Sequence, residues 1–253
     1  MAFGLSDVGL VRQNNEDAWG AVPEIGFFAI ADGMGGHQAG EVAARECITS
    51  LCKIVKKIRS KKKKLSLTET RSSLHKAIEQ VNDIIYKLGH ANPELKGMGT
   101  TLCCMQFHEQ GVVFAHIGDS RIYRYFDGKL IQLTTDHSLM RELIDLGQLS
   151  EGQAPEFLYK NIITKAMGTE PHIEPSILVS EVTDHDTFLM CTDGLSDLLT
   201  PAEIESILSQ DLPVVEAAKI LVKTAKAKGG FDNITVVLIR LKEINDAQDL
   251  SRQ

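Results

Sequence analysis

Acidic residues in this 253-residue chain recur at the ends of short apolar runs, a position where carboxylates bind cations. Four aspartates share it: Asp32 after FFAIA, Asp119 after FAHIG, Asp193 after FLMCT and Asp232 before NITVV. A carboxylate at the mouth of an apolar strand is costly unless it is solvated, hydrogen-bonded or bound to a cation. One such aspartate is ordinarily a turn or helix-cap residue. Four in one chain favour a cation site.

The ligand types in these segments indicate which cation the site binds. Two of the aspartates are followed by glycine, which allows close backbone approach and whose carbonyl oxygen can also ligate a metal. His and Cys do not cluster at zinc spacing. Oxygen ligands alone favour Mg²⁺ or Mn²⁺. Several carboxylates around such ions are the usual parts of a phosphate-processing site.

The N-terminal run RQNNED (12–17) adds two more acids, Glu16 and Asp17, and one arginine. A guanidinium group forks onto phosphate oxygens, which makes Arg12 a candidate for binding a substrate phosphate. An isolated arginine is more often a surface residue. Its place within this acidic run is what favours the functional interpretation.

Alternating strand and helix patterns surround these motifs. Apolar residues at helical spacing predict helices over 40–58 and 67–90, and Ser66 with Glu69 forms a capping box for the second. Between 100 and 133, four short runs separated by turn signals predict sequential antiparallel hairpins. The remaining expected elements are strands over 3–11, 18–31, 173–180, 186–191 and 234–241, and helices over 138–146, from Thr200, and over 213–228.

Composition limits the class of protein. The chain is 43% hydrophobic with a formal charge of −7, so it can fill a large core, and its acidic balance argues against a general nucleic-acid binder. The longest apolar runs are strand-length and the N-terminus lacks a signal-peptide pattern, so we expect no membrane span and a cytoplasmic location. Five cysteines inside apolar segments predict buried free thiols. With no repeat or linker visible, we expect one domain over 1–243 and a polar tail over 244–253.

Taken in order, the motifs resemble those of metal-dependent Ser/Thr protein phosphatases of the 2C type, in their bacterial branch. The resemblance covers about residues 3–241, and its ordered set is far more specific than any single motif. The matching segments are SDVGLVRQNNED (6–17), AIADGMGGHQAGEVA (29–43), GTT (99–101), HIGDSRIY (116–123), TTDHS (134–138), CTDGLSD (191–197) and GFDNITVV (230–237).

The resemblance implies an α+β fold, a four-layer αββα sandwich in which two antiparallel β-sheets pack face to face and are flanked by helices. It also implies two Mn²⁺ or Mg²⁺ ions per active site. Asp32 would bridge them, the Gly33 carbonyl would ligate the second, and Asp193 and Asp232 would complete the first. The other implied roles are water-mediated contacts from Glu16 and Asp17, phosphate binding by Arg12, and a third metal near Asp119 and Asp193.

The implied reaction is hydrolysis of phosphoserine and phosphothreonine in proteins. A hydroxide bridging two metals about 3.5–4 Å apart would attack phosphorus in line, with the metals and Arg12 stabilising the transition state. No cysteine nucleophile is then needed. The implied setting is a bacterial cytoplasm, with phosphorylated proteins as substrates and a Ser/Thr kinase opposing the enzyme, and we expect a monomer.

The sequence departs from the family pattern at two places. Met34 stands where many eukaryotic relatives carry a histidine proposed as general acid, so His37 is either a proton donor or a helix-start residue, and His137 is interpreted as structural. The flap segment (145–165) lacks the usual basic residues. Glu151 and Glu156 are its candidate carboxylates for a third metal.

A basic run is the last feature. Residues 53–64 contain eight Lys and Arg and no acid. The run is either a solvated helix end, which we favour, or a surface for acidic phosphoprotein, nucleic acid or anionic lipid. Two alternatives to an active phosphatase therefore remain: a catalytically inactive phosphoprotein binder, which the intact aspartate set disfavours, and an adaptor built on the lysines.

Overall fold

A computed structural model shows how these motifs are arranged. The structure describes residues 1–36, 39–62, 64–108, 110–150, 152–153, 157–159 and 161–241. His37, Glu151, Glu156 and the expected tail lie outside the described residues, as does the domain boundary expected at 243. Among the helices of the described part, none combines the length and apolar composition that crossing a bilayer requires.

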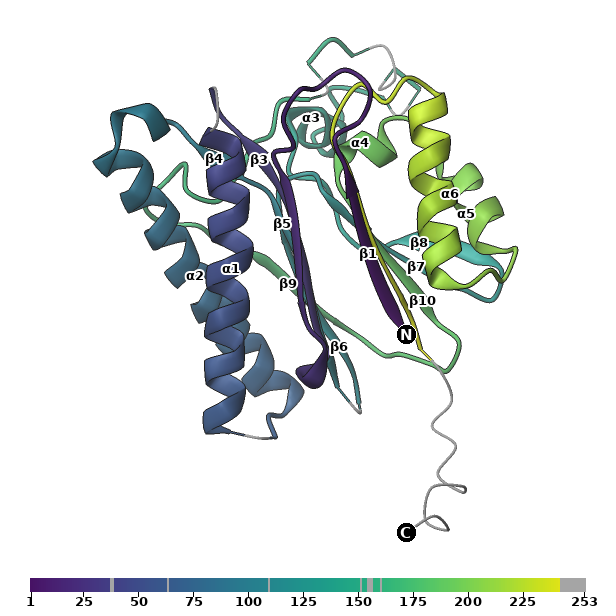
Figure 1. Cartoon of the computed structure of the whole chain (residues 1–253), viewed down its shortest axis with the longest axis horizontal. Helices are drawn as coiled ribbons and strands as arrows, with labels where there is room; N and C mark the ends of the chain where they lie inside the picture. The colour runs from purple at the N-terminus through teal and green to yellow at the C-terminus, as the bar shows by residue number, and fades with distance from the viewer. Residues whose placement is uncertain are drawn as a thin grey trace.

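Two β-sheets form the centre of the molecule (Figure 1). The first has the strand order β1-β11-β10-β7-β8: Ala2–Asp7, Ile234–Arg240, Thr187–Cys191, Arg121–Phe126 and Lys129–Gln132. The second has the order β2-β3-β5-β6-β9, with β4 paired to β3: Asp17–Val22, Phe27–Met34, Leu102–His108, Gly111–Ile117, Ser176–Ser180 and Gly99–Thr100. Every pairing between these strands is antiparallel, as the sequential hairpin pattern predicts.

Helices cover the two outer faces, which gives the four layers expected from the resemblance (Figure 1). The second sheet is covered by α1 (Ala39–Lys61) and α2 (Leu67–Ala91), and the first by α5 (Pro201–Leu208) and α6 (Val214–Ala227). The short helices α3 (Leu139–Asp145) and α4 (Asp193–Ser196) lie at one end of the sandwich. The capping box predicted at Ser66 and Glu69 is present.

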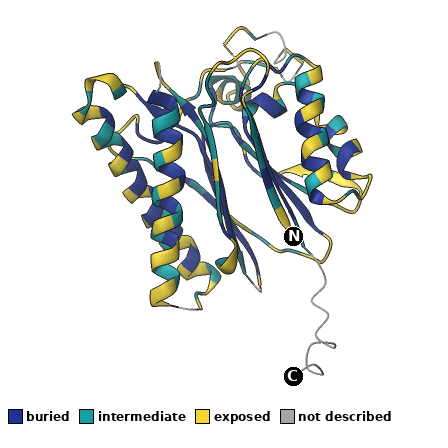
Figure 2. Ribbon diagram, viewed as in Figure 1, coloured by how far each residue is buried: buried dark blue, intermediate teal, exposed yellow. Residues whose placement is uncertain are grey.

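Apolar side chains fill three layers between these elements, and Figure 2 shows the buried faces turned inward. One cluster lies between α1, α2 and the second sheet, and another between α5, α6 and the first sheet. The third joins the two sheets and includes Phe28, Phe114, Phe188 and Met190. A rigid sandwich results, because each sheet is packed on both faces.

Some element boundaries differ from the sequence expectation. The expected strand 18–31 is a hairpin of β2 and β3, because Pro23 lacks an amide donor and Gly26 has a positive φ of 68°. Helix α1 continues through the first lysines to Lys61 instead of ending at 58, since Lys and Arg are good helix formers. Sequence reasoning missed α4, which is only four residues long.

Antiparallel pairing brings the acidic motifs to one edge. Strand β10 ends just before Asp193, and its partner β11 begins just after Asp232. In the other sheet, β2 begins at Asp17 and pairs it directly with Asp32 near the end of β3. All four carboxylates therefore lie at the same end of the sandwich, near α3 and α4 (Figure 1).

Candidate active site

Three partly buried aspartates meet where the two sheets converge, and one carboxylate oxygen of Asp17 and one of Asp193 are fully buried. Asp17 and Asp32 are direct cross-strand partners, and residues so placed have Cβ atoms only about 5 Å apart. The carboxyl of Asp193 lies close enough for its charge to act on that of Asp32. Like charges in such positions repel one another, so this cluster destabilises the chain unless protons or cations neutralise it.

The pKa values of these groups also reflect the unfavourable burial and mutual repulsion of their charges. Burial, and then the charges of Asp17 and Asp193, raise the pKa of Asp32 well above its ordinary value. Burial is also the largest cause of the raised pKa of Asp17 and of Asp193. Carboxyl groups of this kind fit a cation site, because a bound cation stabilises the ionised form that burial disfavours.

Unpartnered oxygen atoms give a second reason to expect cations here. Asp17 Oδ1, Asp119 Oδ1 and Asp193 Oδ1 are buried and lack a hydrogen-bond partner. Within the described residues, no three His, Cys, Asp or Glu side chains already surround one point at ligating distance. The orphaned hard oxygens match what Mn²⁺ or Mg²⁺ requires.

The backbone of Asp32 is fixed by hydrogen bonds from the GTT segment beside it, which is Gly99, Thr100 and Thr101. Thr101 N–H and Thr100 Oγ1 donate to Asp32 O, each at 2.8 Å, and Thr101 Oγ1 accepts from Asp32 N–H at 2.9 Å. Thr101 Oγ1 also bonds Ser120 Oγ at 2.7 Å. Both threonines therefore position the central aspartate.

Gly33 needs to be glycine because other backbone lies against it. A Cβ atom at this position would stand 2.0 Å from Gly40 O, at the start of α1, and 2.7 Å from Glu16 O. Gly33 N–H donates to Glu16 O at 3.0 Å. This close approach keeps Glu16 beside Asp32, and a Cβ atom at Gly40 would in turn stand 2.3 Å from Glu16 Oε2.

Arg12 lies at the rim of the cluster and contacts it directly. Its Nη2 atom is 2.8 Å from Asp232 Oδ2, with about half of the Arg12 side chain exposed. Burial raises the pKa of Glu16, and the positive charge of Arg12 lowers it. The structure thus places an accessible guanidinium between bulk solvent and the buried carboxylates.

Asn233 was missed as a functional residue by the sequence reasoning. Its Oδ1 accepts from Glu16 N–H at 2.8 Å, and its Nδ2 donates to Val8 O at 3.0 Å and Asn14 O at 2.9 Å. One amide side chain therefore fastens the N-terminal segment that carries Arg12 to the start of β11. Its position next to Asp232 in the FDN motif was the signal available.

Thr192 was missed as well. Its Oγ1 donates to Asp17 Oδ2 at 2.9 Å and accepts from Thr235 N–H at 3.0 Å. Thr192 therefore orients the Asp17 carboxylate from the turn that also carries Asp193. No periodicity or motif spacing points to this contact, which joins residues far apart in the sequence.

Asp119 lines a small polar cavity beside the main cluster. Asp193, Asp136 and Asn161 share this cavity, so a residue of the flap faces the carboxylates. Burial, and then the charges of Asp193 and Asp136, raise the pKa of Asp119 to about 7. Asp136 is itself paired with Arg121, whose Nη2 atom is 2.6 Å from Asp136 Oδ2.

His137 lies next to this cavity and not within the carboxylate cluster. Its Nδ1 accepts from Gly118 N–H at 3.1 Å, its Nε2 bonds Ser176 Oγ at 3.1 Å, and its ring stacks on that of His116 at 4.6 Å. Burial, followed by the nearby His116, lowers the pKa of His137 to about 4. These contacts support the structural role expected of His137.

Met34, which stands at the position where many eukaryotic relatives carry a histidine, is the last residue of β3.

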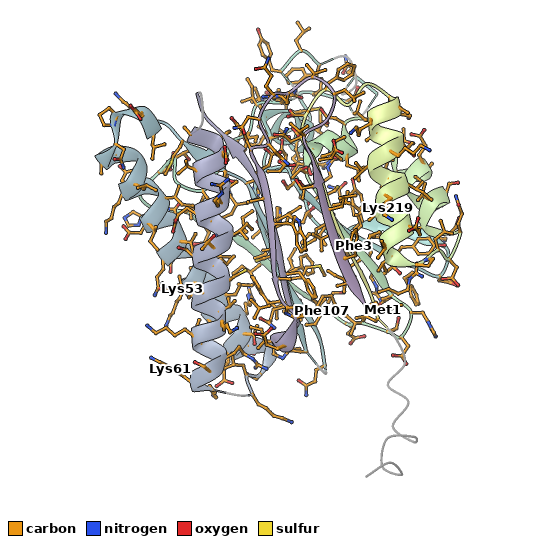
Figure 3. All side chains as sticks on the ribbon, in the orientation of Figure 1. Met1, Phe3, Lys53, Lys61, Phe107 and Lys219 are labelled. Carbon is orange, nitrogen blue, oxygen red and sulfur yellow. The ribbon has the colours of Figure 1, made fainter. Side chains whose placement is uncertain are left out.

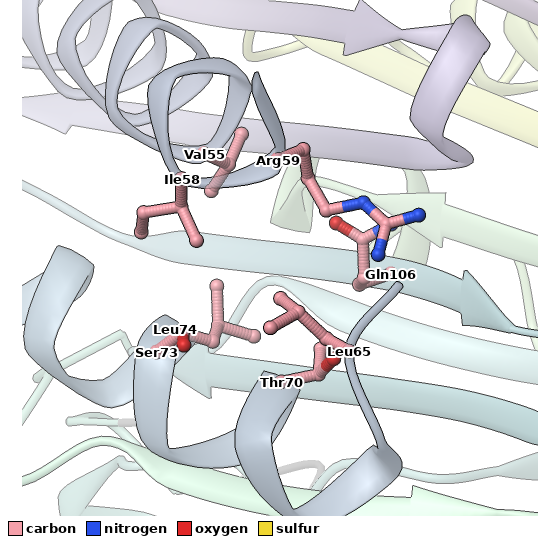
Figure 4. Close-up of a pocket in the computed structure, with 8 residues that line it drawn as sticks. All are labelled: Val55, Ile58, Arg59, Leu65, Thr70, Ser73, Leu74 and Gln106. Carbon is pink, nitrogen blue, oxygen red and sulfur yellow. The ribbon is translucent and has the colours of Figure 1, made fainter. Parts of the chain in front are cut away.

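The basic run lies far from the site, at the opposite end of α1. Figure 3 shows Lys53 and Lys61 on the outer side of this helix. Lys56 pairs with Glu24 at 2.9 Å, and Lys62 pairs with Glu69. A small cavity between α1 and α2, shown in Figure 4, has a mostly aliphatic lining that includes Val55 and Leu74 and contains no carboxylate. This end of the molecule thus shares no residue with the carboxylate cluster.

All five cysteines are free, and four of them are buried. Burial is the largest cause of the raised pKa of Cys191, which reaches about 12. A thiol with such a pKa is protonated at neutral pH and is a poor nucleophile. The expectation of buried free thiols is confirmed for four of the five, and Cys52 is a half-buried free thiol.

Comparison with known proteins agrees with this geometry. Residues 10–228 match the family model described as Protein phosphatase 2C. The chain is 35% identical over 249 residues to serine/threonine phosphatase stp of Listeria innocua, covering 97% of this chain and 98% of that protein. It is 36% identical over 244 residues to protein phosphatase PhpP of Streptococcus pneumoniae, covering 94% and 96% respectively.

Solved structures give the same result. The serine/threonine phosphatase PstP/Ppp of Mycobacterium tuberculosis superposes with a TM-score of 0.87 at 35% identity, over 96% of this chain and 99% of that one. A structure of the PstP catalytic domain in complex with two manganese ions superposes with a TM-score of 0.83 at 34% identity, over 96% and 98%. Since both sequence and fold match almost end to end, the chain belongs to the protein phosphatase 2C family.

Proposed function

We propose that this chain is a metal-dependent phosphoprotein phosphatase that hydrolyses phosphoserine and phosphothreonine with two Mn²⁺ or Mg²⁺ ions. The observation that carries the proposal is the meeting of Asp17, Asp32 and Asp193, with two orphaned oxygens, beside the accessible guanidinium of Arg12. Buried carboxylates that need cations, next to a group that binds phosphate, are the parts of a metal-assisted phosphate hydrolase. The PstP structure with two manganese ions supports the same cofactor.

The residues have distinct proposed roles. Asp32 would contact both ions, and the Gly33 carbonyl, Asp193 and Asp232 would complete their coordination. Glu16 and Asp17 would act through ordered waters, and Asp119 with Asp193 would hold a third ion. When bound, the ions supply Lewis acidity and an activated water for in-line attack on phosphorus.

Arg12 would release Asp232 and fork onto the substrate phosphate, where it offsets the charge on the equatorial oxygens. Thr192, Thr100 and Thr101 hold the carboxylates in place during the reaction. With no cysteine at the cluster and every cysteine of the chain accounted for, a phosphocysteine is not part of this proposal.

The test is phosphate release from a phosphothreonine peptide with Mn²⁺, Mg²⁺ or a chelator. We expect activity with either metal and none with the chelator, restored when metal is added back. Asp193→Ala should abolish it in folded protein. Activity that survives chelation would rule out the metal mechanism. A metal-loaded chain that binds phosphopeptide without hydrolysing it would favour the inactive-binder alternative.

Arg12→Ala gives a second prediction. A hydrogen bond to a charged group contributes about 1.5–3 kcal/mol, so kcat/KM for the peptide should fall at least tenfold, mainly through KM. Arg71→Ala, an exposed arginine on α2, is the matched control and should leave both constants unchanged. If kcat and KM were the same in wild type and Arg12→Ala, the assignment of Arg12 as a phosphate-binding residue would be wrong.

The proposed setting follows from the relatives. We propose that the chain acts in a bacterial cytoplasm as a monomer and opposes a Ser/Thr kinase. Its phosphoprotein substrates are expected to approach the carboxylate end of the sandwich.

A further inference from the structure

Exposed apolar side chains gather beside the residues that would bind the phosphate and the metals. Leu10 and Val11 directly precede Arg12, and Phe231 directly precedes Asp232. These three side chains are 62%, 61% and 63% exposed. Single exposed apolar residues are ordinary, but a contiguous group beside a functional site is typical of an interaction surface. We call Leu10 and Phe231 the apolar ledge, and Val11 is the exposed neighbour of Leu10 in the chain.

The ledge is one surface although its members are about 220 residues apart in the chain. Leu10 N–H donates to Gly230 O at 2.8 Å, which joins the two loops. A Cβ atom at Gly230 would stand 3.1 Å from Leu10 Cγ, and one at Gly229 would overlap the Phe231 ring. Phe231 therefore folds back over Gly229, and Leu10 covers Gly230. The Arg12–Asp232 ion pair closes the same junction.

The ledge continues into a groove that reaches the carboxylates. Phe231 and Leu198 line this groove together with Asp193, Asp197 and Asp232, and Asn161 of the flap faces them. None of its described lining residues is a lysine or arginine. A chain that enters the groove meets the apolar side chains of Phe231 and Leu198 beside carboxylates whose charge bound cations would offset. An apolar neighbour is favoured there, and an acidic neighbour is disfavoured because its charge would lose hydration against the apolar surface.

We propose that the apolar ledge selects phosphoprotein substrates with an apolar side chain close to the phosphorylated residue and against an acidic one. The proposal rests on the proposed phosphatase function, because the ledge is adjacent to Arg12. With the phosphate on Arg12, a neighbouring substrate residue lies within reach of Leu10 or Phe231. Burying it there removes apolar surface of both chains from water.

The test uses phosphothreonine peptides that differ only at one of the two positions on either side of the phosphorylated residue. Leucine, alanine or glutamate is placed there, and kcat/KM is measured with Mn²⁺. We expect kcat/KM for the leucine peptide to exceed that for the alanine peptide by roughly fivefold at one or more positions. One methylene group in a closed apolar pocket changes kcat/KM by at least about tenfold, and we expect a smaller effect here because the ledge remains partly exposed to water. Glutamate should fall below alanine at the same position.

Two variants test the ledge itself. Phe231→Ala and, independently, Leu10→Asn should each bring the leucine-to-alanine ratio toward one, while Phe231→Leu should retain most of it. Phe126→Ala is the matched control: Phe126 is 43% exposed and lies at the other end of β7 from Arg121, roughly 16 Å away. The leucine-to-alanine ratio of kcat/KM in Phe126→Ala should equal that of the wild type.

The remaining outcomes of these experiments would overturn either the specificity inference alone or the proposed function as well. A wild-type ratio of one at every position, a preference for glutamate, or a ratio that survives in both ledge variants would overturn the inference while leaving the phosphatase function intact. If sedimentation showed a dimer that Phe231→Ala dissociates without changing the ratio, the ledge would be a contact between copies. Absence of Mn²⁺-dependent hydrolysis of every peptide would overturn the proposed function and this inference with it.

Discussion

At the scale of single residues, the site is defined by groups that destabilise the chain without cations. Asp17 and Asp32 are buried opposite one another, and Asp32 also adjoins Asp193. Apolar or amide residues would be more stable there, because burying like charges is costly. Retaining three carboxylates at such a position is expected where function requires the charge.

This reasoning predicts opposite effects of one substitution on activity and on stability. Asp32→Asn keeps the shape of the side chain but removes the charge. In metal-free protein at pH 8 it should raise the free energy of unfolding by on the order of 2 kcal/mol, while abolishing phosphatase activity. Chemical denaturation in chelator and a peptide assay with Mn²⁺ measure the two effects.

Asp127→Asn is the matched control for that substitution. Asp127 is exposed and has a positive φ of 48°, a conformation that asparagine tolerates, so neither quantity should change. If Asp32→Asn lowered the stability of the metal-free protein, the buried-charge explanation of the site would be wrong.

At the scale of elements, hydrogen bonds between distant segments position the site. Asn233, at the start of β11, holds the segment between β1 and β2 through Val8 O, Asn14 O and Glu16 N–H. The strands fix where each carboxylate begins, but this side chain fixes where Arg12 lies. We expect this loop to become mobile when the three hydrogen bonds of the Asn233 side chain are removed.

Asn233→Ala should therefore cost both stability and substrate binding. Three hydrogen bonds at about 1 kcal/mol each predict a loss near 3 kcal/mol, and a mobile Arg12 should raise KM more than it lowers kcat. Denaturant unfolding and peptide kinetics measure the two changes. Asn92 follows the end of α2 and donates one hydrogen bond to Leu88 O, so Asn92→Ala should cost under 1 kcal/mol and leave KM unchanged. An unaltered KM in Asn233→Ala would show that Arg12 is positioned by other contacts.

At the scale of the whole molecule, the buried carboxyl groups couple stability to pH. Burial raises the pKa of Asp119 to about 7 in the folded chain, from about 4 when it is unfolded. A group whose pKa is raised by folding contributes stability that is fully present below pH 4 and is lost as the pH rises through 7. For Asp119 alone the loss is on the order of 4 kcal/mol.

The metal-free protein should accordingly melt at a lower temperature at pH 8 than at pH 5.5, and Mn²⁺ should restore most of the difference at pH 8. Metal binding favours the ionised carboxylates that high pH produces, so its stabilising effect grows with pH. Thermal unfolding with chelator or Mn²⁺ measures this. Asp119→Asn should flatten the slope in chelator. A metal-free protein that becomes more stable from pH 5.5 to 8 would contradict the interpretation.

Much of the fold followed from local patterns. Hydrophobic periodicity and turn signals predicted the long helices and the central hairpins, because those depend on residues close together in the chain. Boundaries were less predictable. The 18–31 segment proved to be a hairpin, since its turn at Pro23 and Gly26 interrupts an otherwise continuous apolar pattern. The four residues of α4 were too few to show a period.

By itself, the sequence determined the chemistry of this protein: oxygen ligands at strand ends, an arginine among them, and an ordered motif series that identifies a family. Those features are chemical and local, so they can be read without coordinates. Only the tertiary structure decided that Asn233 and Thr192 hold the site together, and that Leu10 and Phe231 form one surface. Such contacts join residues some 175 to 225 positions apart, and the packing of two sheets, not any local pattern, brings them within hydrogen-bonding distance.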